Sequence, residues 1–323
     1  MFRINKPATS ILQICKSTSF KTRMYSAQPE FKPKKKTILD INKKHSAGDK
    51  MVMITAHDYP SAKAANQNTV DIVLVGDSLA MTILGYENTL ELKLDEMIHH
   101  SKAVSRALSI PYLVSDLTFG SYNKSNDIAI DSAIRMHSEG HADCVKLEGG
   151  NPFICDRVRH IIGCGGVSVC GHIGLTPQSS SSLGGFRVQG KSLSAATSLI
   201  EQALNLELAG CSLIVLEAMP EFLAAGITKL LNVPTFGIGA GRFTSGQIAV
   251  SPDIANFSNL PNLPKFVNNY ENLGSRLSDA IEKFSSDVTQ GSYPHQTKHV
   301  YNVDPRIKDE IRSFFIKQYN IEI

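Results

Sequence analysis

The sequence lacks two features whose absence removes whole classes of protein. No apolar run approaches the roughly 20 residues of a membrane-spanning helix, so we expect no such helix. No two of the six cysteines form a Cys-x-x-Cys pair, and their spacing indicates neither a structural zinc site nor a disulfide framework. The composition is otherwise that of an ordinary globular protein, with 42% hydrophobic and 20% charged residues.

Acidic residues outnumber basic ones in the body of the chain, after residue 36. Residues 1–36 carry nine Lys and Arg against one acid, Glu30, whereas the net charge of all 323 residues is only +3. The segment therefore contributes +8, and the remaining residues contribute −5. A mildly acidic body offers no electrostatic footprint for a phosphate backbone, so we expect no nucleic-acid partner.

The basic N-terminus has the composition of a targeting segment. Residues 1–28 contain Arg, Lys, Ser and Thr without a single acid, which is typical of a mitochondrial transit peptide. The sequence RMYS at 23–26 resembles a matrix-processing site, and a disordered tail without an address is the alternative. We expect a transit peptide and basic linker over 1–36 and a location in the mitochondrial matrix.

From residue 50 onwards, short β-branched runs alternate with longer helical patterns. The runs are nearly continuous in hydrophobicity, which is typical of strands covered on both faces. They occupy 51–55, 71–75, 110–115, 143–147, 167–171, 212–216 and 233–238. An eighth and weaker candidate lies at 247–250, directly before Pro252.

Helix signals fill the intervals between these runs. Apolar residues recur at helical spacing over 94–108. Asp127 is predicted to cap the next helix, and Ser192 or Ser194 to cap a later one. Pro220 is predicted to lie in the first turn of another helix.

Repeated strand–helix units predict a parallel sheet. A closed (β/α)8 barrel has the right size, and an open doubly wound sheet is the alternative. Helical patterns continue beyond it, at 269–288 and 304–323. We expect a catalytic barrel over 37–301 and a C-terminal helical tail over 302–323.

Acids recur where the predicted strands end. The residues concerned are Asp77, Asp116, Glu148 and Glu217. In a barrel these ends meet at one rim, where active sites are built. A single acid would be an ordinary helix cap, but four acids at strand ends would repel one another on a half-buried rim. We therefore expect a cation among them.

The residue types indicate the kind of chemistry. Asp and Glu are hard oxygen ligands, and no cluster of Cys or His accompanies them, which favours Mg²⁺. Lys146, one strand away, suits an anionic group on a metal-bound ligand. Partial burial of Glu217 would make it a usable general base. Together they indicate metal-assisted abstraction of a proton next to a carbonyl.

Seven motifs occur in a recognisable order: LVGDSLAMT, SDLTF, VKLEGG, VCGHIGLTPQS, GGFRVQG, VLEAMP and GIGAG. In these motifs the chain resembles the ketopantoate hydroxymethyltransferase family, from about Thr37 to about Tyr301. The resemblance implies a (β/α)8 TIM barrel of the phosphoenolpyruvate mutase and isocitrate lyase superfamily. It also implies a homo-oligomer, which in this family is often a decamer.

The same resemblance implies an activity, the first step of pantothenate biosynthesis. A hydroxymethyl group passes from 5,10-methylenetetrahydrofolate to 3-methyl-2-oxobutanoate through a Mg²⁺-stabilised enolate, giving 2-dehydropantoate. By motif, Asp77 and Asp116 match metal-ligating aspartates that also meet the substrate, and Glu148 matches a glutamate that holds the Mg²⁺ shell through water. Ser78 and Lys146 match groups that hold the 2-oxoacid.

A further motif assigns the base, and several positions depart from the family pattern, two of them near the last predicted strand. Glu217, in VLEAMP, matches the catalytic base, and His172 is expected to support the site from behind. SGQ at 245–247 replaces the more usual Asp-Gly-Gln, and SPD at 251–253 replaces a His-Asp pairing. Both departures bear on the last barrel strand.

Two other functions fit parts of the sequence. One is a carbon–carbon lyase acting on another metal-bound 2-oxoacid, because Cys170 precedes Gly171-His172 as in isocitrate-lyase-type enzymes. That class needs its cysteine on a mobile polar loop, whereas VSVC is typical of a strand interior. The other is an inactive barrel kept as an assembly or binding protein, whose signature would be the loss of the strand-end acids.

Overall fold

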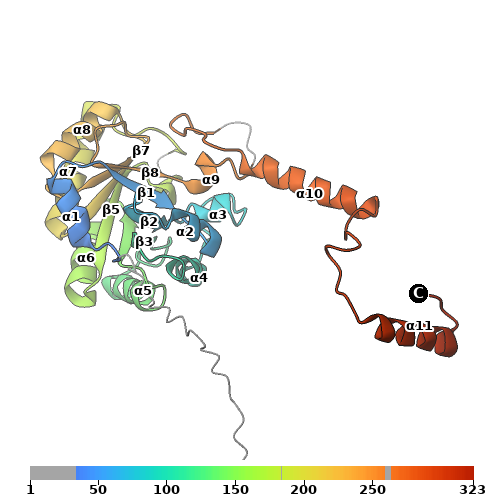
Figure 1. Cartoon of the computed structure of the whole chain (residues 1–323). Coiled ribbons are helices and arrows are strands. Elements are labelled where there is room, and N and C mark those ends of the chain that lie inside the picture. The colour runs from blue at the N-terminus through green and yellow to red at the C-terminus, as the bar shows by residue number, and fades with distance from the viewer. Residues whose placement is uncertain (1–33, 183, 259–262) are drawn as a thin grey trace, which may run out of the picture. The chain divides into compact units, whose positions relative to one another are not determined.

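The structure, a computed structural model, describes residues 34–182, 184–258 and 263–323. The predicted transit peptide and its processing site lie outside the described residues. Eight parallel strands close into a barrel in chain order, which confirms the closed barrel over the open sheet (Figure 1). The strands are β1 (Met51–Thr55), β2 (Ile72–Val75), β3 (Tyr112–Asp116), β4 (Cys144–Glu148), β5 (Ser168–Gly174), β6 (Leu213–Glu217), β7 (Thr235–Ile238) and β8 (Gly246–Ala249).

Helices alternate with the strands and surround the barrel, as Figure 1 shows for α1 to α8. The α-helices are α1 (Ile38–Ser46), α2 (Tyr59–Ala65), α3 (Leu79–Thr82), α4 (Leu94–Ser105), α5 (Asn126–Ser138), α6 (Pro152–His160), α7 (Leu193–Ala209), α8 (Glu221–Leu230), α9 (Ser251–Ile254), α10 (Leu273–Thr289) and α11 (Pro305–Tyr319). A π-helical turn, η1 (Ile161–Gly165), and a 3-10 turn, η2 (Pro177–Ser179), flank β5. Within the described residues, none of these helices is long and apolar enough to cross a membrane.

The caps show where local prediction succeeded. Ser192 caps α7 as predicted, since its hydroxyl accepts a hydrogen bond from the Ala195 backbone N–H. The prediction for Asp127 was wrong, because Ser125 is the N-cap of α5 and Asp127 lies in the first turn. An acid in the first turn still favours the positive end of the helix, which is why the two assignments look alike in sequence. Pro220 stands one residue earlier than predicted, as the N-cap of α8.

Two apolar layers stabilise the barrel. One fills its interior with residues from all eight strands and includes Cys144 and Cys170. The other lies between the strands and the surrounding helices and includes Cys155 and Cys211. These four buried thiols act as small apolar side chains, and Cys170 belongs to a strand interior as the sequence predicted.

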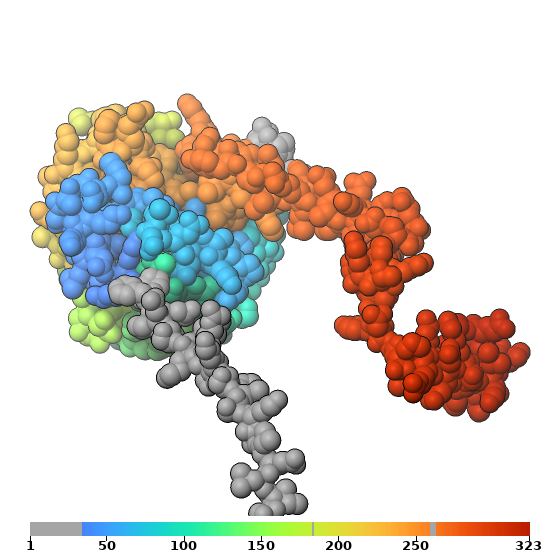
Figure 2. All heavy atoms as spheres, in the orientation of Figure 1, coloured from blue at the N-terminus to red at the C-terminus, as the bar shows by residue number. Residues whose placement is uncertain are grey.

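The eighth strand forms despite the departures around it. Gly246 of β8 pairs with Met51 of β1 and with Phe236 of β7, which closes the barrel. A Cβ at Gly246 would lie 2.6 Å from the Phe236 ring, so only glycine fits here. Ser251, just after β8, donates its backbone N–H to the Thr55 hydroxyl at the end of β1. In Figure 2, blue atoms from the start of the barrel border orange atoms from its end.

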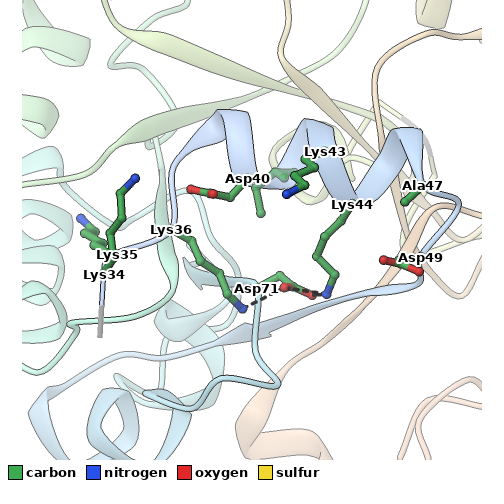
Figure 3. Close-up of a pocket in the computed structure, with 10 residues that line it drawn as sticks. Lys34, Lys35, Lys36, Asp40, Lys43, Lys44, Ala47, Asp49 and Asp71 are labelled. Carbon is green, nitrogen blue, oxygen red and sulfur yellow. Dashed lines mark hydrogen bonds and ion pairs between the residues drawn. The ribbon is translucent and has the colours of Figure 1, made fainter. Parts of the chain in front are cut away.

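A buried carboxylate anchors the amino-terminal end of the barrel. Asp71, directly before β2, lies between Lys36, which precedes α1, and Lys44, in the last turn of α1 (Figure 3). Both Nζ atoms are 2.9 Å from its carboxylate, and the Val52 backbone N–H donates to it at 3.0 Å. Ile41 of α1 completes the apolar interior at this end. The ion pairs therefore fasten α1 across the end of the barrel opposite the predicted site.

Candidate active site

The predicted site residues converge at the carboxyl-terminal rim of the barrel. Asp77 follows β2 after a single glycine, and Asp116 and Glu148 are the last residues of β3 and β4. Lys146 pairs in register with Asp116, and it shares a face of β4 with Glu148 because strand side chains alternate. Glu217 ends β6. The closed parallel barrel brings these ends to one place.

Most of these side chains are withdrawn from water. Asp77, Asp116, Lys146 and Glu148 are buried, each with no more than 5% of its surface exposed. The Glu217 side chain is 16% exposed. Removing one unpaired carboxylate from water costs several kcal/mol. Three carboxylates around a single lysine therefore require more positive charge than Lys146 supplies.

Asp116 lies between its two neighbours. Its Oδ2 accepts a hydrogen bond from the Asp77 backbone N–H at 2.9 Å and lies 3.1 Å from Lys146 Nζ. Burial raises the pKa of Asp116 despite the lysine. Among the described residues, its buried Oδ1 has no hydrogen-bond partner.

Asp77 is the acid that most needs a cation. Burial raises its pKa well above its ordinary value, and the carboxylates of Asp116 and Glu148 raise it further. Its Oδ2 accepts a hydrogen bond from Gln178 Nε2 at 2.8 Å. A divalent ion beside Asp77 would favour the ionised form and oppose this shift in pKa.

Glu148 has a different environment. Its Oε2 accepts a hydrogen bond from the Gln178 backbone N–H at 2.9 Å, and its Oε1 lies 3.4 Å from His172 Nδ1. Burial raises the pKa of Glu148, but His172 and Lys146 outweigh burial and leave the pKa below its ordinary value. Glu148 is therefore ionised at neutral pH.

His172 of β5 joins this cluster to Glu217. Its Nε2 lies 3.1 Å from Glu217 Oε2. Burial and Lys146 lower the pKa of His172, but the two glutamates outweigh them and raise it to about 9. The two glutamates therefore favour the charged imidazole, whereas Lys146 Nζ, 3.3 Å from His172 Nδ1, opposes it. The contact through Nε2 places His172 next to the carboxylate of the predicted base, Glu217.

Ser78 begins the short helix α3 and is half-buried. A Cβ at Gly76 would lie 3.2 Å from the Ser78 hydroxyl, so the strand end and the serine are tightly packed. Asp77 does not act as the ordinary helix cap that a single acid at a strand end would be. Ser78 occupies the N-cap position, no side-chain cap bond forms there among the described residues, and the Asp77 carboxylate turns to Gln178 instead.

The donor set fits a hard divalent cation. Two buried carboxylate oxygens, Asp116 Oδ1 and Glu148 Oε1, have no hydrogen-bond partner within 34–182, 184–258 and 263–323. Mg²⁺ is commonly held by one or two carboxylates and keeps several waters. In the part of the chain that the structure describes, no three Asp, Glu, His or Cys side chains are placed to hold one ion by themselves. The arrangement therefore suits two carboxylate ligands with water completing the shell.

Two members of this network were missed in the sequence. Gln178 lies in the 3-10 turn after β5, and Tyr122 lies in the loop after β3. The Tyr122 hydroxyl donates to Gln178 Oε1 at 2.6 Å. The motif GHIGLTPQ contains Gln178 and was a signal that this position matters. Membership of a motif does not reveal which strand ends a side chain reaches.

Comparison with protein families gives a clear match. Residues 35–296 match the family model described as ketopantoate hydroxymethyltransferase. The matched segment covers all eight strands and every predicted site residue.

Individual relatives agree with the family match. A Clostridium acetobutylicum 3-methyl-2-oxobutanoate hydroxymethyltransferase is 45% identical over 81% of this chain and 94% of its own length. An Emericella nidulans protein of the same name is 41% identical over 95% of this chain and 90% of its own length. The Arabidopsis thaliana relative, named as enzyme 1 and mitochondrial, is 39% identical over 85% of this chain and 80% of its own length.

Solved structures share the fold at low sequence identity. A phosphonopyruvate hydrolase in complex with oxalate and Mg²⁺ has a TM-score of 0.52 and 13% identity, over 88% of this chain and 99% of its own. A 2,3-dimethylmalate lyase of the PEP mutase/isocitrate lyase superfamily has a TM-score of 0.53 and 11% identity, over 88% and 98%. The chain therefore shares the barrel fold of these two proteins.

Proposed function

The chain belongs to the ketopantoate hydroxymethyltransferase family. We propose that its strand-end carboxylates bind Mg²⁺ and that 5,10-methylenetetrahydrofolate is the donor of the hydroxymethyl group. The enzyme transfers a hydroxymethyl group to 3-methyl-2-oxobutanoate, the first step of pantothenate biosynthesis. One observation carries the proposal for the metal. Three buried carboxylates share one lysine, and two of their oxygens have no hydrogen-bond partner among the described residues.

Asp77 and Asp116 would hold the ion directly, and Glu148 would hold it through water. The backbone N–H of Asp77 donates to Asp116, so the two acids are already fixed relative to each other. When bound, Mg²⁺ polarises the 2-oxo group of the substrate and so acidifies the proton on the adjacent carbon.

Lys146 and Ser78 would anchor the oxoacid. Asp116, Glu148 and Asp77 raise the pKa of Lys146 although burial opposes them, so its ammonium remains charged. A buried ammonium at this rim attracts an anionic oxygen strongly, because little water competes for it. The half-buried hydroxyl of Ser78 adds a neutral donor beside Asp77.

Glu217 would remove the substrate proton. Its carboxylate accepts the proton from the carbon next to the 2-oxo group, and the electron pair moves onto the 2-oxo oxygen, where Lys146 stabilises the charge. His172, 3.1 Å away, keeps Glu217 oriented. The resulting enolate carbon would form a bond to the methylene carbon of the folate, and water would supply the oxygen of the hydroxymethyl group. The two carbon–nitrogen bonds to that carbon break, and tetrahydrofolate leaves with one proton from Glu217 and one from water.

The alternative functions have less support. Cys170 is fully buried in β5, and burial raises the pKa of its thiol well above its ordinary value. It therefore lacks the exposure that a catalytic cysteine on a mobile loop requires. The strand-end acids are retained, which disfavours an inactive barrel.

The proposal is tested by following 2-dehydropantoate formation. We expect EDTA to abolish activity and Mg²⁺ to restore it. Glu217→Gln should lower kcat by about 10²–10⁴-fold, the usual contribution of a general base. Glu221→Gln, on the exposed start of α8, serves as the matched control and should remain active. Activity that survives both EDTA and Glu217→Gln would contradict the proposal.

We also propose that the protein is a homo-oligomer, as the family resemblance implies, with a decamer as the expected form. Helix α10 supports this proposal, because one face of it is an apolar stripe that is 43–60% exposed in the single chain: Leu273, Leu277, Ile281, Phe284 and Val288. Such stripes are normally covered by a protein partner. Light scattering should show a larger assembly, and Ile281→Asp should reduce its mass. A monomeric wild-type protein would contradict this proposal.

The mitochondrial matrix is the location we propose. The supporting observations are the acid-free, basic composition of 1–28 and the mitochondrial label of the Arabidopsis relative. Fusion of residues 1–36 to a fluorescent protein should direct it to the matrix, and removal of these residues from the whole protein should prevent import. A cytosolic fusion would contradict the prediction.

A further inference from the structure

Gln178 connects two of the three buried carboxylates. Its Nε2 donates to Asp77 Oδ2 at 2.8 Å and to the Leu117 carbonyl oxygen at 2.9 Å. Its backbone N–H donates to Glu148 Oε2 at 2.9 Å. The residue itself is buried, with 5% of its surface exposed. One neutral residue thus satisfies an oxygen on each of two acids.

The carboxamide has only one favourable orientation. Nε2 faces two acceptors, the Asp77 carboxylate and the Leu117 carbonyl. Oε1 faces the Tyr122 hydroxyl, whose oxygen accepts from the Glu148 backbone N–H at 3.3 Å and whose proton is therefore free for Gln178. Turning the amide over would place Oε1 against two acceptors and lose both bonds. The network thus determines that an N–H faces Asp77.

Gln178 bonds one oxygen of each acid, and the near neighbour of Glu148 Oε1 is His172 Nδ1, at 3.4 Å. Gln178 occupies Oδ2 of Asp77 and Oε2 of Glu148. Glu148 Oε1 is one of the buried oxygens without a hydrogen-bond partner in the described part of the chain. A neutral donor favours the ionised carboxylate and adds no charge that would repel a cation. A lysine in the same place would compete with the ion.

We propose that Gln178 is the positioning residue of the cation site, holding the carboxylates of Asp77 and Glu148 in place for a divalent ion. The inference rests on the proposed metal-dependent function. Gln178 acts through the two acids and is not itself a ligand. Loss of such a hydrogen-bonding partner behind a metal ligand typically costs 10–100-fold in metal affinity.

The test measures binding of Mg²⁺ alone to the full chain by calorimetry, with Mn²⁺ and electron paramagnetic resonance as a second probe. Gln178→Met keeps the side-chain length and the backbone donor to Glu148 but removes the side-chain bond to Asp77. Its Kd for Mg²⁺ should rise about 10–100-fold. Gln202→Met is the matched control, since it makes the same substitution at a glutamine of α7 whose amide donates to the Ser198 hydroxyl on the same helix.

Four results would separate the possibilities. An unchanged Kd in Gln178→Met, or an equal loss in Gln202→Met, would overturn the positioning role. Recovery of activity in Gln178→Met as Mg²⁺ is raised to saturation would support it, because a defect in folding would not respond in this way. Absence of Mg²⁺ binding to the wild-type protein would instead overturn the proposed metal-dependent function.

If Gln178→Met does not fold, amide hydrogen exchange of the wild-type protein tests the positioning role of Gln178 instead. The cation and the turn that carries Gln178 stabilise each other reciprocally. Mg²⁺ should therefore slow amide exchange over 175–182. Exchange in this segment that is unaffected by saturating Mg²⁺ would overturn the inference.

Discussion

Asp71→Asn should destabilise the barrel at neutral pH without touching the active site. Asp71 is fully buried and accepts hydrogen bonds from Lys36 Nζ, Lys44 Nζ and the Val52 backbone N–H. An asparagine keeps one acceptor oxygen but turns an NH₂ group toward donors that have no lone pair. The two lysines lose the charge that holds α1 across this end of the barrel.

The expected loss follows from the burial of the partners. Removing one partner of a buried ion pair costs about 3–5 kcal/mol. The side chains of Lys36 and Lys44 are 19% and 36% exposed, so each can recover part of its hydration, and the lower value of about 3 kcal/mol applies. For a barrel of this size, that loss lowers Tm by about 5 °C. Asp49 is an exposed acid in the pocket that Asp71, Lys36 and Lys44 also line (Figure 3). The control Asp49→Asn should change the free energy of unfolding by no more than about 0.5 kcal/mol.

The pH dependence gives an independent check. Burial raises the pKa of Asp71, but hydrogen bonds from Lys36, Lys44 and Val52 outweigh burial and leave the pKa below its ordinary value. The stabilisation is therefore complete above the unfolded-state pKa of about 3.9 and is lost as the pH falls through the folded-state pKa. Denaturant unfolding should show a constant gap between wild type and Asp71→Asn at pH 5–7 that narrows below about pH 4. Equal stability at pH 7, or a gap that widens in acid, would refute the reasoning.

Three further predictions concern the rim, the closure and the cysteines. Lys146→Met removes the lysine ammonium from beside the buried acids, so the free energy of unfolding without Mg²⁺ should fall by about 3–5 kcal/mol. In differential scanning fluorimetry, Mg²⁺ should then raise the Tm of the variant more than that of the wild type. An equal rise in both proteins would contradict this prediction. Gly246→Ala should destabilise the protein by about 1–3 kcal/mol through contact with the Phe236 ring. Gly226→Ala, in an open position on α8, should stabilise it by up to about 1 kcal/mol. Equal effects of the two substitutions in denaturant unfolding would contradict the close packing of β8 on Phe236. Iodoacetamide should modify Cys164 before the four buried cysteines between 144 and 211, as peptide mass spectrometry can show, because burial protects those thiols; early modification of a buried cysteine would contradict the packing.

The strands were predictable because their signal is local. A strand buried on both faces must be apolar along its whole length, and that property can be read from a few adjacent residues. Even the weak candidate at 247–250 forms a strand, one residue earlier, as β8 (Gly246–Ala249). Its formation depends on Gly246, whose lack of a side chain admits the Phe236 ring, and that contact joins two strands.

The caps were less predictable because competing residues stand close together. Ser125 and Asp127 are both good N-terminal residues, and the choice between them depends on which backbone N–H groups each can reach. Asp77 illustrates the same limit at the site. Its position shortly before a helix would allow it to serve as a cap. Its carboxylate instead accepts a hydrogen bond from Gln178, which follows another strand.

The sequence by itself determined where the strands run and that Asp77, Asp116, Glu148 and Glu217 stand at their ends, because hydrophobic continuity and residue type are properties of short stretches. Only the tertiary structure decided which oxygen meets which donor. Asp77 and Gln178 are 101 positions apart, and they meet because the barrel closes. Hydrogen bonds depend on distances of a few tenths of an ångström and on direction, and no local pattern of residues carries that information.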